Sequence, residues 1–236
     1  MIALAFDTTS DHLSVAARAA DGRTALRSLD GARLHAAALL GLVDEAAREA
    51  GGSVQSIGTL ALADGPGSFT GLRVGAAVMK ALARALPARP GIASASTLLV
   101  RAAASAPPHV RVLVVTSALR GEVYAARYRL DLPRSVETLE APAVRRPEQV
   151  SGEADLLVAD LPGRLLDQLA DRLELPVVRP PLSLPRAEAL LALIGVPGGA
   201  APIADPDGWE PGYGRPAEAE RRWEEAHGRP LPHPAR

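Results

Sequence analysis

The 236-residue chain contains no cysteine, and aromatic residues make up only 3% of it. The absence of cysteine excludes disulfide bonds, thiol nucleophiles and metal sites built from thiolates, and it is compatible with a reducing compartment. Lysine occurs once, at Lys80, so nearly all of the positive charge is carried by arginine. Catalysis by a nucleophilic cysteine is therefore excluded.

An excess of charge of one sign is also absent, since the net charge at pH 7 is −1. Such a chain has no broad electrostatic surface for nucleic acid or for an anionic membrane, so any contact with RNA is expected to be local or made through a partner. No apolar run approaches the length of about 18 residues that spans a bilayer, and no basic segment precedes the first apolar run. We expect a cytoplasmic protein without membrane contact.

Hydrophobic residues, in contrast, make up 47% of the chain, which is enough for a large buried core. The most informative stretch, 61–83, has a glycine-rich turn followed directly by a helix with almost no polar side. At about 100° per residue, Arg73, Lys80 and Arg84 fall on one stripe roughly 40° wide. The remaining apolar arc is wider than that of an ordinary surface helix. It must meet either a second layer of the same chain or another protein.

Apolar periodicity and turn residues divide the first half of the chain into strands and helices. We expect strands at 2–6, 13–18, 24–29, 57–63 and 91–93, and helices at 33–50, 70–86 and 96–104. Ser68 or Thr70 is the expected cap of the second helix. Pro107 and Pro108 mark the predicted domain boundary.

The second half repeats the order of the first in a weaker form. We expect strands at 110–116, 122–128, 156–159 and 176–179, and helices at 163–173 and 185–194. From residue 197 onward, proline and glycine dominate. We expect an ordered segment at 209–215 and a short helix at 216–227. The predicted division is a first domain of residues 1–106, a smaller second domain of residues 107–195, and a C-terminal segment, 196–236, that packs back on the first domain and has a loose end.

Several polar residues suggest sites, and each has a structural alternative. The turn Gly65-Pro66-Gly67-Ser68 could cradle an anion at the start of a helix, but it has no Lys-Ser/Thr pair at Walker spacing. The favoured interpretation is that glycine permits a tight turn and the close approach of a helix. His35 is expected to be a hydrogen-bonding residue, and Glu122 and Tyr124 are expected to lie on one exposed face of a strand.

Five segments together resemble the TsaB (YeaZ) family of bacterial proteins, which take part in making threonylcarbamoyladenosine in tRNA. They are IALAFDTTS at 2–10, His35 with Leu39 and Leu40, GPGSFTGLRVG at 65–75, GEVY at 121–124, and Tyr213 with Arg215. The resemblance covers the first 128 residues well. It implies an α/β fold of two actin-like lobes, of the ribonuclease H-like (ASKHA) type, with mixed sheets flanked by helices and a reduced second lobe.

The resemblance also implies a non-catalytic protein that dimerises with TsaD, a relative on the same fold that holds a metal and modifies adenosine 37 of tRNAs reading codons that begin with A. In TsaD relatives a His-x-x-x-His pair binds the metal, and the corresponding positions here are Thr97 and Arg101. An arginine guanidinium stays protonated and repels a cation. We therefore expect neither a catalytic residue nor a metal site in this chain.

Nucleotide binding is a second point of departure from the family. The candidate residues are Asp7, Thr8 and Thr9, which resemble the first phosphate turn of actin-like ATPases, and Gly65, Gly67 and Ser68 of the glycine-rich turn. The family often has an acidic and a basic residue in the turn before Gly-Glu-Val, where this chain has Ser117 and Leu119. Without that carboxylate, Mg²⁺ on ATP loses one anchor. We expect no required cofactor, while ATP at the interface with a partner stays open.

The helices at 33–50 and 70–86 are predicted to bind TsaD. The candidate interface residues are His35, Leu39, Leu42, Val43, Ala46, Gly71, Val74, Gly75, Val78 and Leu82. Burial of apolar surface, at about 25 cal/mol per Å², is the expected attraction. Leu39→Glu or Val78→Asp is expected to abolish binding and leave the fold intact. Homodimerisation through the same helices competes when TsaD is absent. The resemblance adds TsaE to the larger complex, with tRNA contacted through the complex.

Two other functions stay open from the sequence. An actin-like ATPase or small-molecule kinase would bind Mg²⁺-ATP between the lobes, near Asp7, Thr9 and Gly65. A free-standing interaction protein would pair with some other actin-like partner, because an apolar helix face does not name its partner.

Overall fold

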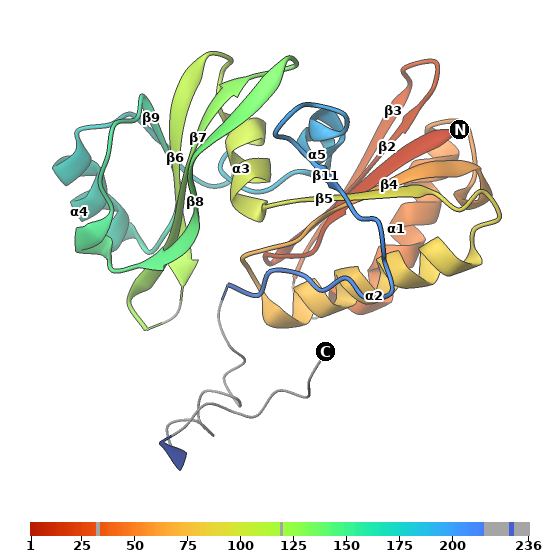
Figure 1. The fold of residues 1–236 in the computed structure, drawn as a ribbon, viewed down its shortest axis with the longest axis horizontal. Coiled ribbons are helices and arrows are strands. Elements are labelled where there is room, and N and C mark those ends of the chain that lie inside the picture. The colour runs from red at the N-terminus through yellow and green to blue at the C-terminus, as the bar shows by residue number, and fades with distance from the viewer. Residues whose placement is uncertain (32–33, 119, 215–226, 229–236) are drawn as a thin grey trace.

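The computed structural model describes residues 1–31, 34–118, 120–214 and 227–228. Two mixed β-sheets lie on either side of a pair of helices, and further helices cover the outer faces of the sheets (Figure 1). The chain builds the first sheet and then the second, after which one helix and a short edge strand return to the first. Among these described residues, no helix is both long enough and apolar enough to cross a membrane.

The first sheet is built around its N-terminal strand. Its strands are β1 (Ile2–Asp7), β2 (His12–Ala19), β3 (Thr24–Asp30), β4 (Ile57–Ala63), β5 (Gly91–Ala95) and β11 (Ala201–Pro202). Their order is β11-β5-β4-β1-β2-β3. The β1-β2-β3 meander is antiparallel, whereas β1, β4 and β5 run parallel to one another. The carboxyl ends of β1 and β4 therefore meet at the same edge of the sheet.

Helices α1 (His35–Glu49) and α2 (Phe69–Ala85) cover the outer face of this sheet. Ser68 caps α2, because its side chain accepts a hydrogen bond from the Gly71 amide at 3.2 Å. The helices and the sheet enclose one apolar core. The wide apolar arc of α2 is thus met, over much of its width, by the chain's own sheet.

The second sheet repeats the topology of the first. Its strands are β6 (Val110–Ala118), β7 (Glu122–Asp131), β8 (Ser135–Arg145), β9 (Leu156–Asp160) and β10 (Val177–Val178). Their order is β10-β9-β6-β7-β8. β6 pairs antiparallel with β7 and parallel with β9, as β1 pairs with β2 and β4. This duplicated order confirms the predicted pair of lobes.

The second lobe is reduced because its described residues include no counterpart of α1. Between β8 and β9 the chain has only the 3₁₀ turn η3 (Pro147–Gln149), while α4 (Gly163–Leu173) corresponds to α2. The part of the outer sheet face beyond α4 carries ion pairs, which join Arg111 to Glu153 and Asp155, Arg127 and Arg145 to Glu140, and Arg129 to Glu137. A polar sheet face of this kind can lie in water without a covering helix.

Two helices form the layer between the sheets. α3 (Thr97–Ser105) packs on β6 and β7, α5 (Ala187–Leu193) packs on β1 and β2, and the two helices contact each other within one apolar core. The Ala187 amide donates a hydrogen bond to Ser14 Oγ at 2.7 Å. The predicted second domain, 107–195, included α5. The structure corrects this boundary, because the apolar side of α5 completes the inner face of the first sheet.

Residues 203–214, which we call the C-terminal strap, run over α2 (Figure 1). Arg84 on α2 pairs with Asp207 at 2.8 Å, and Trp209 packs on the core beneath the helix. The Gly212 amide donates to the Asp64 carbonyl at 2.8 Å. The strap therefore returns to the carboxyl end of β4. The helix predicted at 216–227 falls almost wholly outside the described residues.

Candidate functional site

Most of the predicted interface residues on α1 and α2 lie inside the chain's own core. The buried ones are His35, Leu39, Val43, Ala46, Gly71, Gly75 and Leu82. Leu42, Val74 and Val78 are half-buried. The assignment of the seven buried residues as contacts is corrected by this packing, because their side of each helix meets the first sheet. They stabilise the fold, and a partner cannot reach them in this conformation.

The outward sides of the same helices are apolar as well. Leu34, Leu40 and Phe69 have 50%, 54% and 42% of their surface exposed. Small exposed residues accompany them, namely Ala36, Ala37 and Gly41 on α1 and Ala77 and Ala81 on α2. Small residues around large apolar ones allow another helix to approach closely. We call these eight residues the outer helix surface.

The six candidate nucleotide-binding residues are brought together between β1 and α2, where the two turns pack against each other. The Ser68 amide donates to the Thr9 carbonyl at 2.7 Å, and Thr8 Oγ1 donates to the Gly71 carbonyl at 2.8 Å. A Cβ on Gly67 or Gly71 would clash with the backbone of Thr9 or Thr8. The glycines thus allow close packing, as in the structural interpretation. The Ser68 amide and the Thr8 hydroxyl therefore bond within the protein rather than pointing into free space.

Asp7 lies fully buried beside these turns. Its Oδ1 accepts hydrogen bonds from the amide and the hydroxyl of Thr9, each at 2.8 Å, and its Oδ2 has no hydrogen-bond partner among the described residues. Burial raises the pKa of the Asp7 carboxyl, while the Thr9 hydrogen bonds and the charge of Arg101 lower it. The ionised form of Asp7 therefore depends on Thr9 and Arg101.

Thr97 and Arg101 lie one turn apart on α3, and both are buried. The Thr97 amide donates to the Gly65 carbonyl at 2.8 Å, and Arg101 pairs with Asp160 at 3.0 Å. Burial lowers the pKa of Arg101, while Asp160 and Asp7 raise it. A protonated guanidinium cannot ligate a cation. Within the described ranges, no three His, Cys, Asp or Glu side chains are grouped so as to hold a metal ion.

A second carboxyl, that of the half-buried Asp64, follows β4 at the same edge of the first sheet. Burial raises the pKa of Asp64, and a hydrogen bond with Ser94 lowers it. On β7 in the second sheet, burial raises the pKa of Tyr128 to about 12, and the charge of Asp64 adds to the shift. Neither residue was predicted as part of a site. The only sequence signal for Asp64 was its position directly after a predicted strand.

We call the region around Asp7, Asp64 and Arg101 the joint between the lobes. The C-terminal strap covers one side of this joint. Gly65 has a φ of +109°, and a Cβ there would clash with the Gly212 carbonyl. The rings of Tyr213 and Phe69 lie 4.8 Å apart, inclined at 37°. Gly214 approaches the ring of Tyr124 on β7. Tyr213 of the Tyr-x-Arg motif therefore holds the strap on α2, whereas Arg215 lies outside the described residues.

Two interpretations of single residues can be compared with the structure. The His35 ring, with Nε2 3.3 Å from the Asp11 carbonyl oxygen, has a hydrogen-bond partner, as expected. Glu122 is half-buried, but Tyr124 is only 7% exposed. The prediction of an exposed face was wrong for Tyr124, because the side of β7 that carries Tyr124 faces α3 and the C-terminal strap.

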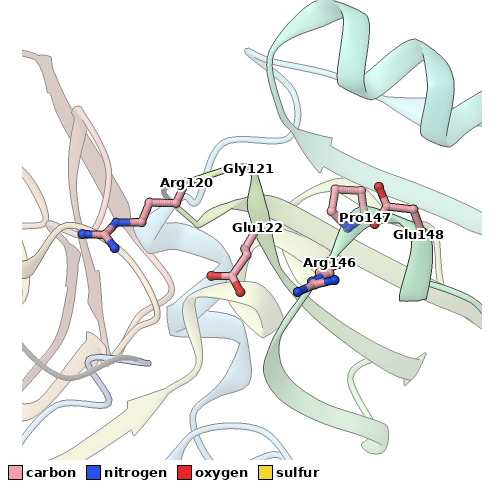
Figure 2. A pocket seen from close by; sticks show the side chains of 6 residues that line it. All are labelled: Arg120, Gly121, Glu122, Arg146, Pro147 and Glu148. Carbon is pink, nitrogen blue, oxygen red and sulfur yellow. The ribbon is translucent and has the colours of Figure 1, made fainter. Parts of the chain in front are cut away.

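An open hollow of about 550 Å³ lies beside the turn between β6 and β7 (Figure 2). It is lined by Arg120, Gly121, Glu122, Arg146, Pro147 and Glu148. Figure 2 shows the Arg120 side chain extending from the turn away from Glu148. Sequence reasoning did not identify this hollow, because η3 lies far along the chain from the turn. Its two arginines and two glutamates balance, so the lining gives no net preference for an anion or a cation.

The chain and its structure are similar to known proteins. Residues 30–185 match the family described as TsaD: tRNA N6-adenosine threonylcarbamoyltransferase. The tRNA threonylcarbamoyladenosine biosynthesis protein TsaB of Escherichia coli is 35% identical over 159 residues, which cover 64% of this chain and 68% of that protein. The TsaB protein of Haemophilus influenzae is 33% identical over 134 residues, or 56% of each chain.

Two solved structures share the fold over most of the chain. YeaZ from Pseudomonas aeruginosa has a TM-score of 0.68 and 28% identity, covering 82% of this chain and 90% of that one. A crystal structure of an uncharacterized protein with similarity to peptidase YeaZ from Pseudomonas aeruginosa has a TM-score of 0.73 and 28% identity, covering 91% and 99%. With its two duplicated lobes, this chain belongs to the TsaB (YeaZ) family of the actin-like superfamily.

Proposed function

We propose that this chain takes part in threonylcarbamoyladenosine biosynthesis in tRNA as a non-catalytic subunit that dimerises with TsaD. The name of the E. coli relative supports the pathway. The match of residues 30–185 to the TsaD family supports a partner built on the same fold. Two related folds can pack equivalent helix pairs against each other about an approximate two-fold axis.

The outer helix surface is the observation that carries this proposal. Leu40 and Phe69 are about half exposed on neighbouring helices, among alanines and a glycine. Burying one leucine or phenylalanine side chain contributes about 1.5–3 kcal/mol. Exposed arginines, Arg73 and Arg84, flank the apolar side chains of α2 and supply a polar rim. The same surface serves a homodimer when TsaD is absent.

The non-catalytic role is supported by the joint between the lobes. Arg101 holds a positive charge beside Asp7 and Asp160, and the turns around Thr8 and Gly71 bond to each other. In this proposal, any ATP in the assembly binds at the interface with TsaD. The near-neutral charge of the chain suits a subunit that meets tRNA through the complex, which TsaE completes.

The proposal is tested by titration calorimetry against TsaD from the same organism. Leu40→Glu puts a charge on the outer helix surface and is expected to weaken binding at least about 30-fold, as the loss of a central contact does. Leu182→Glu is the matched control, because Leu182 is 63% exposed in the loop before α5. Equal, unaltered affinities for both variants would refute this surface as the interface.

A further inference from the structure

Arg101 lies in the layer formed by α3 and α5 between the two sheets, where it contacts residues from segments that belong to different lobes. Its side chain is almost fully buried, on α3, which packs against the second sheet. One terminal nitrogen pairs with Asp160 Oδ2 at 3.0 Å, at the end of β9. The other donates to the Ser183 carbonyl at 2.9 Å. Ser183 lies in the loop that leads to α5, the helix packed on the first sheet.

The charges around Arg101 come from both sheets. Asp7 ends β1 of the first sheet and is fully buried, whereas the Asp160 side chain is 37% exposed. Both carboxylates act on the guanidinium electrostatically. A buried arginine is tolerated only when it is paired and hydrogen-bonded. One cation thus balances two carboxylates that end strands of different sheets.

The position of this cation also bears on ligand binding. In open α/β sheets, ligands bind beyond the carboxyl ends of the strands. Here β9 ends at Asp160, and the guanidinium of Arg101 joins this last residue of the strand to the loop at Ser183. The charge of Asp7, at the end of β1, also acts on this guanidinium. We propose that the side chain of Arg101 holds the two lobes in one relative position. Its guanidinium also takes the place of a bound cation or cationic ligand at this joint.

The loop at Ser183 is also hydrogen-bonded to α3, so that α3 on the second sheet is linked through this loop to α5 on the first sheet. Ser105 Oγ donates to the Leu182 carbonyl at 2.8 Å, and Arg186, which precedes α5, donates to the Ala104 carbonyl. Arg101 adds the only ion pair from α3 among the described residues. Removing its charge should therefore loosen the lobes without removing the apolar core around α3 and α5.

The absence of cysteine allows a direct test by spin labelling. Ala85→Cys on α2 and Gln168→Cys on α4 place labels at exposed sites on opposite lobes and outside the outer helix surface (Figure 1). In this background, Arg101→Met should at least double the width of the label-to-label distance distribution measured by pulsed electron paramagnetic resonance. Arg111→Met is the matched control, since its ion pairs lie within the second lobe, and it should leave the width unchanged.

A second variant keeps the test decisive if Arg101→Met does not fold. Asp160→Asn removes the paired charge from a partly exposed side chain and keeps its size, so the fold should survive. It should broaden the same distribution and raise the equilibrium constant of unfolding at least tenfold more than Arg111→Met does. A distribution as narrow as that of the parent protein in either folded variant would overturn the proposal. The outcome does not depend on whether the chain binds TsaD.

Discussion

Thr8 Oγ1 donates a hydrogen bond to the Gly71 carbonyl oxygen at 2.8 Å and so fastens the turn after β1 to the first turn of α2. The contact requires glycine, because a Cβ at position 71 would clash with the Thr8 carbonyl group. The glycine-rich motif is thus explained by packing between a strand end and a helix. The same packing sets the direction in which α2 presents its outer side.

Gly71→Ala should therefore destabilise the protein, by about 2 kcal/mol or more, as overpacking of a rigid contact does. Gly41→Ala on α1 is the control, because a Cβ at Gly41 meets nothing within 4 Å. An alanine in a helix interior should raise the free energy of unfolding by about 0.5–1 kcal/mol. Urea unfolding of both variants measures the difference. Equal stabilities would contradict the packing explanation of Gly71.

The same substitution at two neighbouring leucines of α1 should change stability to very different extents. Leu39 is fully buried and Leu40 is 54% exposed. Leu39→Glu should lower the free energy of unfolding by about 3 kcal/mol or more, because it buries a charge and removes core contacts. Leu40→Glu should change it by less than about 0.5 kcal/mol. Thermal unfolding followed by circular dichroism distinguishes them. A cooperative, stable Leu39→Glu variant would show that α1 is placed differently.

The raised pKa of Asp7 predicts a pH dependence of stability. Between the unfolded value of 3.8 and the raised folded value, the folded protein binds more protons at this carboxyl than the unfolded chain does. The contribution of Asp7 to the free energy of unfolding therefore falls as pH rises through this window. Asp7→Asn should remove that fall, so its stability relative to the parent should increase from pH 4 upward and then level off.

Asp21 is the control for Asp7, because its pKa is shifted in the opposite direction. Hydrogen bonds from Arg23 lower the pKa of Asp21, so this carboxylate contributes stability above 3.8 that is lost as pH falls through its folded value. Asp21→Asn should therefore lose stability relative to the parent as pH rises toward 4. Urea unfolding in steps from pH 2.5 to pH 7 separates the two windows. A pH-independent difference for Asp7→Asn would contradict the buried placement of Asp7.

Gly65→Ala should release the C-terminal strap from the joint. The new Cβ would clash with the Gly212 carbonyl, and alanine disfavours the positive φ at this position. Chymotrypsin should then cleave after Trp209 or Tyr213 several times faster than in the parent. Gly91→Ala is the control, since a Cβ there meets nothing within 4 Å. Unchanged cleavage in Gly65→Ala would mean that the strap is held elsewhere.

Much of the fold could be predicted from the sequence because its elements have strong local signals. β4 and α4 match their predicted bounds, 57–63 and 163–173, and Ser68 is the cap of α2. β8 was missed because Ser135–Arg145 alternates charged residues with few apolar ones and contains Pro142. Its outward side chains pair with arginines on β7 rather than with a helix. A two-residue edge strand such as β11 has no pattern to detect.

The candidate site could be predicted less well, because a helical wheel finds the apolar arc and not what covers it. On α1, the strongest part of the arc meets the first sheet through Leu39 and Val43, and only the weaker side reaches solvent at Leu40. Arg101 was identified as a departure from a metal ligand, but its pairing with Asp160 joins residues far apart in the chain. Such long-range partners have no local signal.

The most direct test of the proposed function is native mass spectrometry of this chain mixed with TsaD from the same organism, with and without ATP, beside each protein alone. We predict a one-to-one complex that displaces the homodimer and is lost in Leu40→Glu but kept in Leu182→Glu. No complex under any of these conditions, together with ATP bound to this chain alone, would contradict the account and favour an actin-like ATPase.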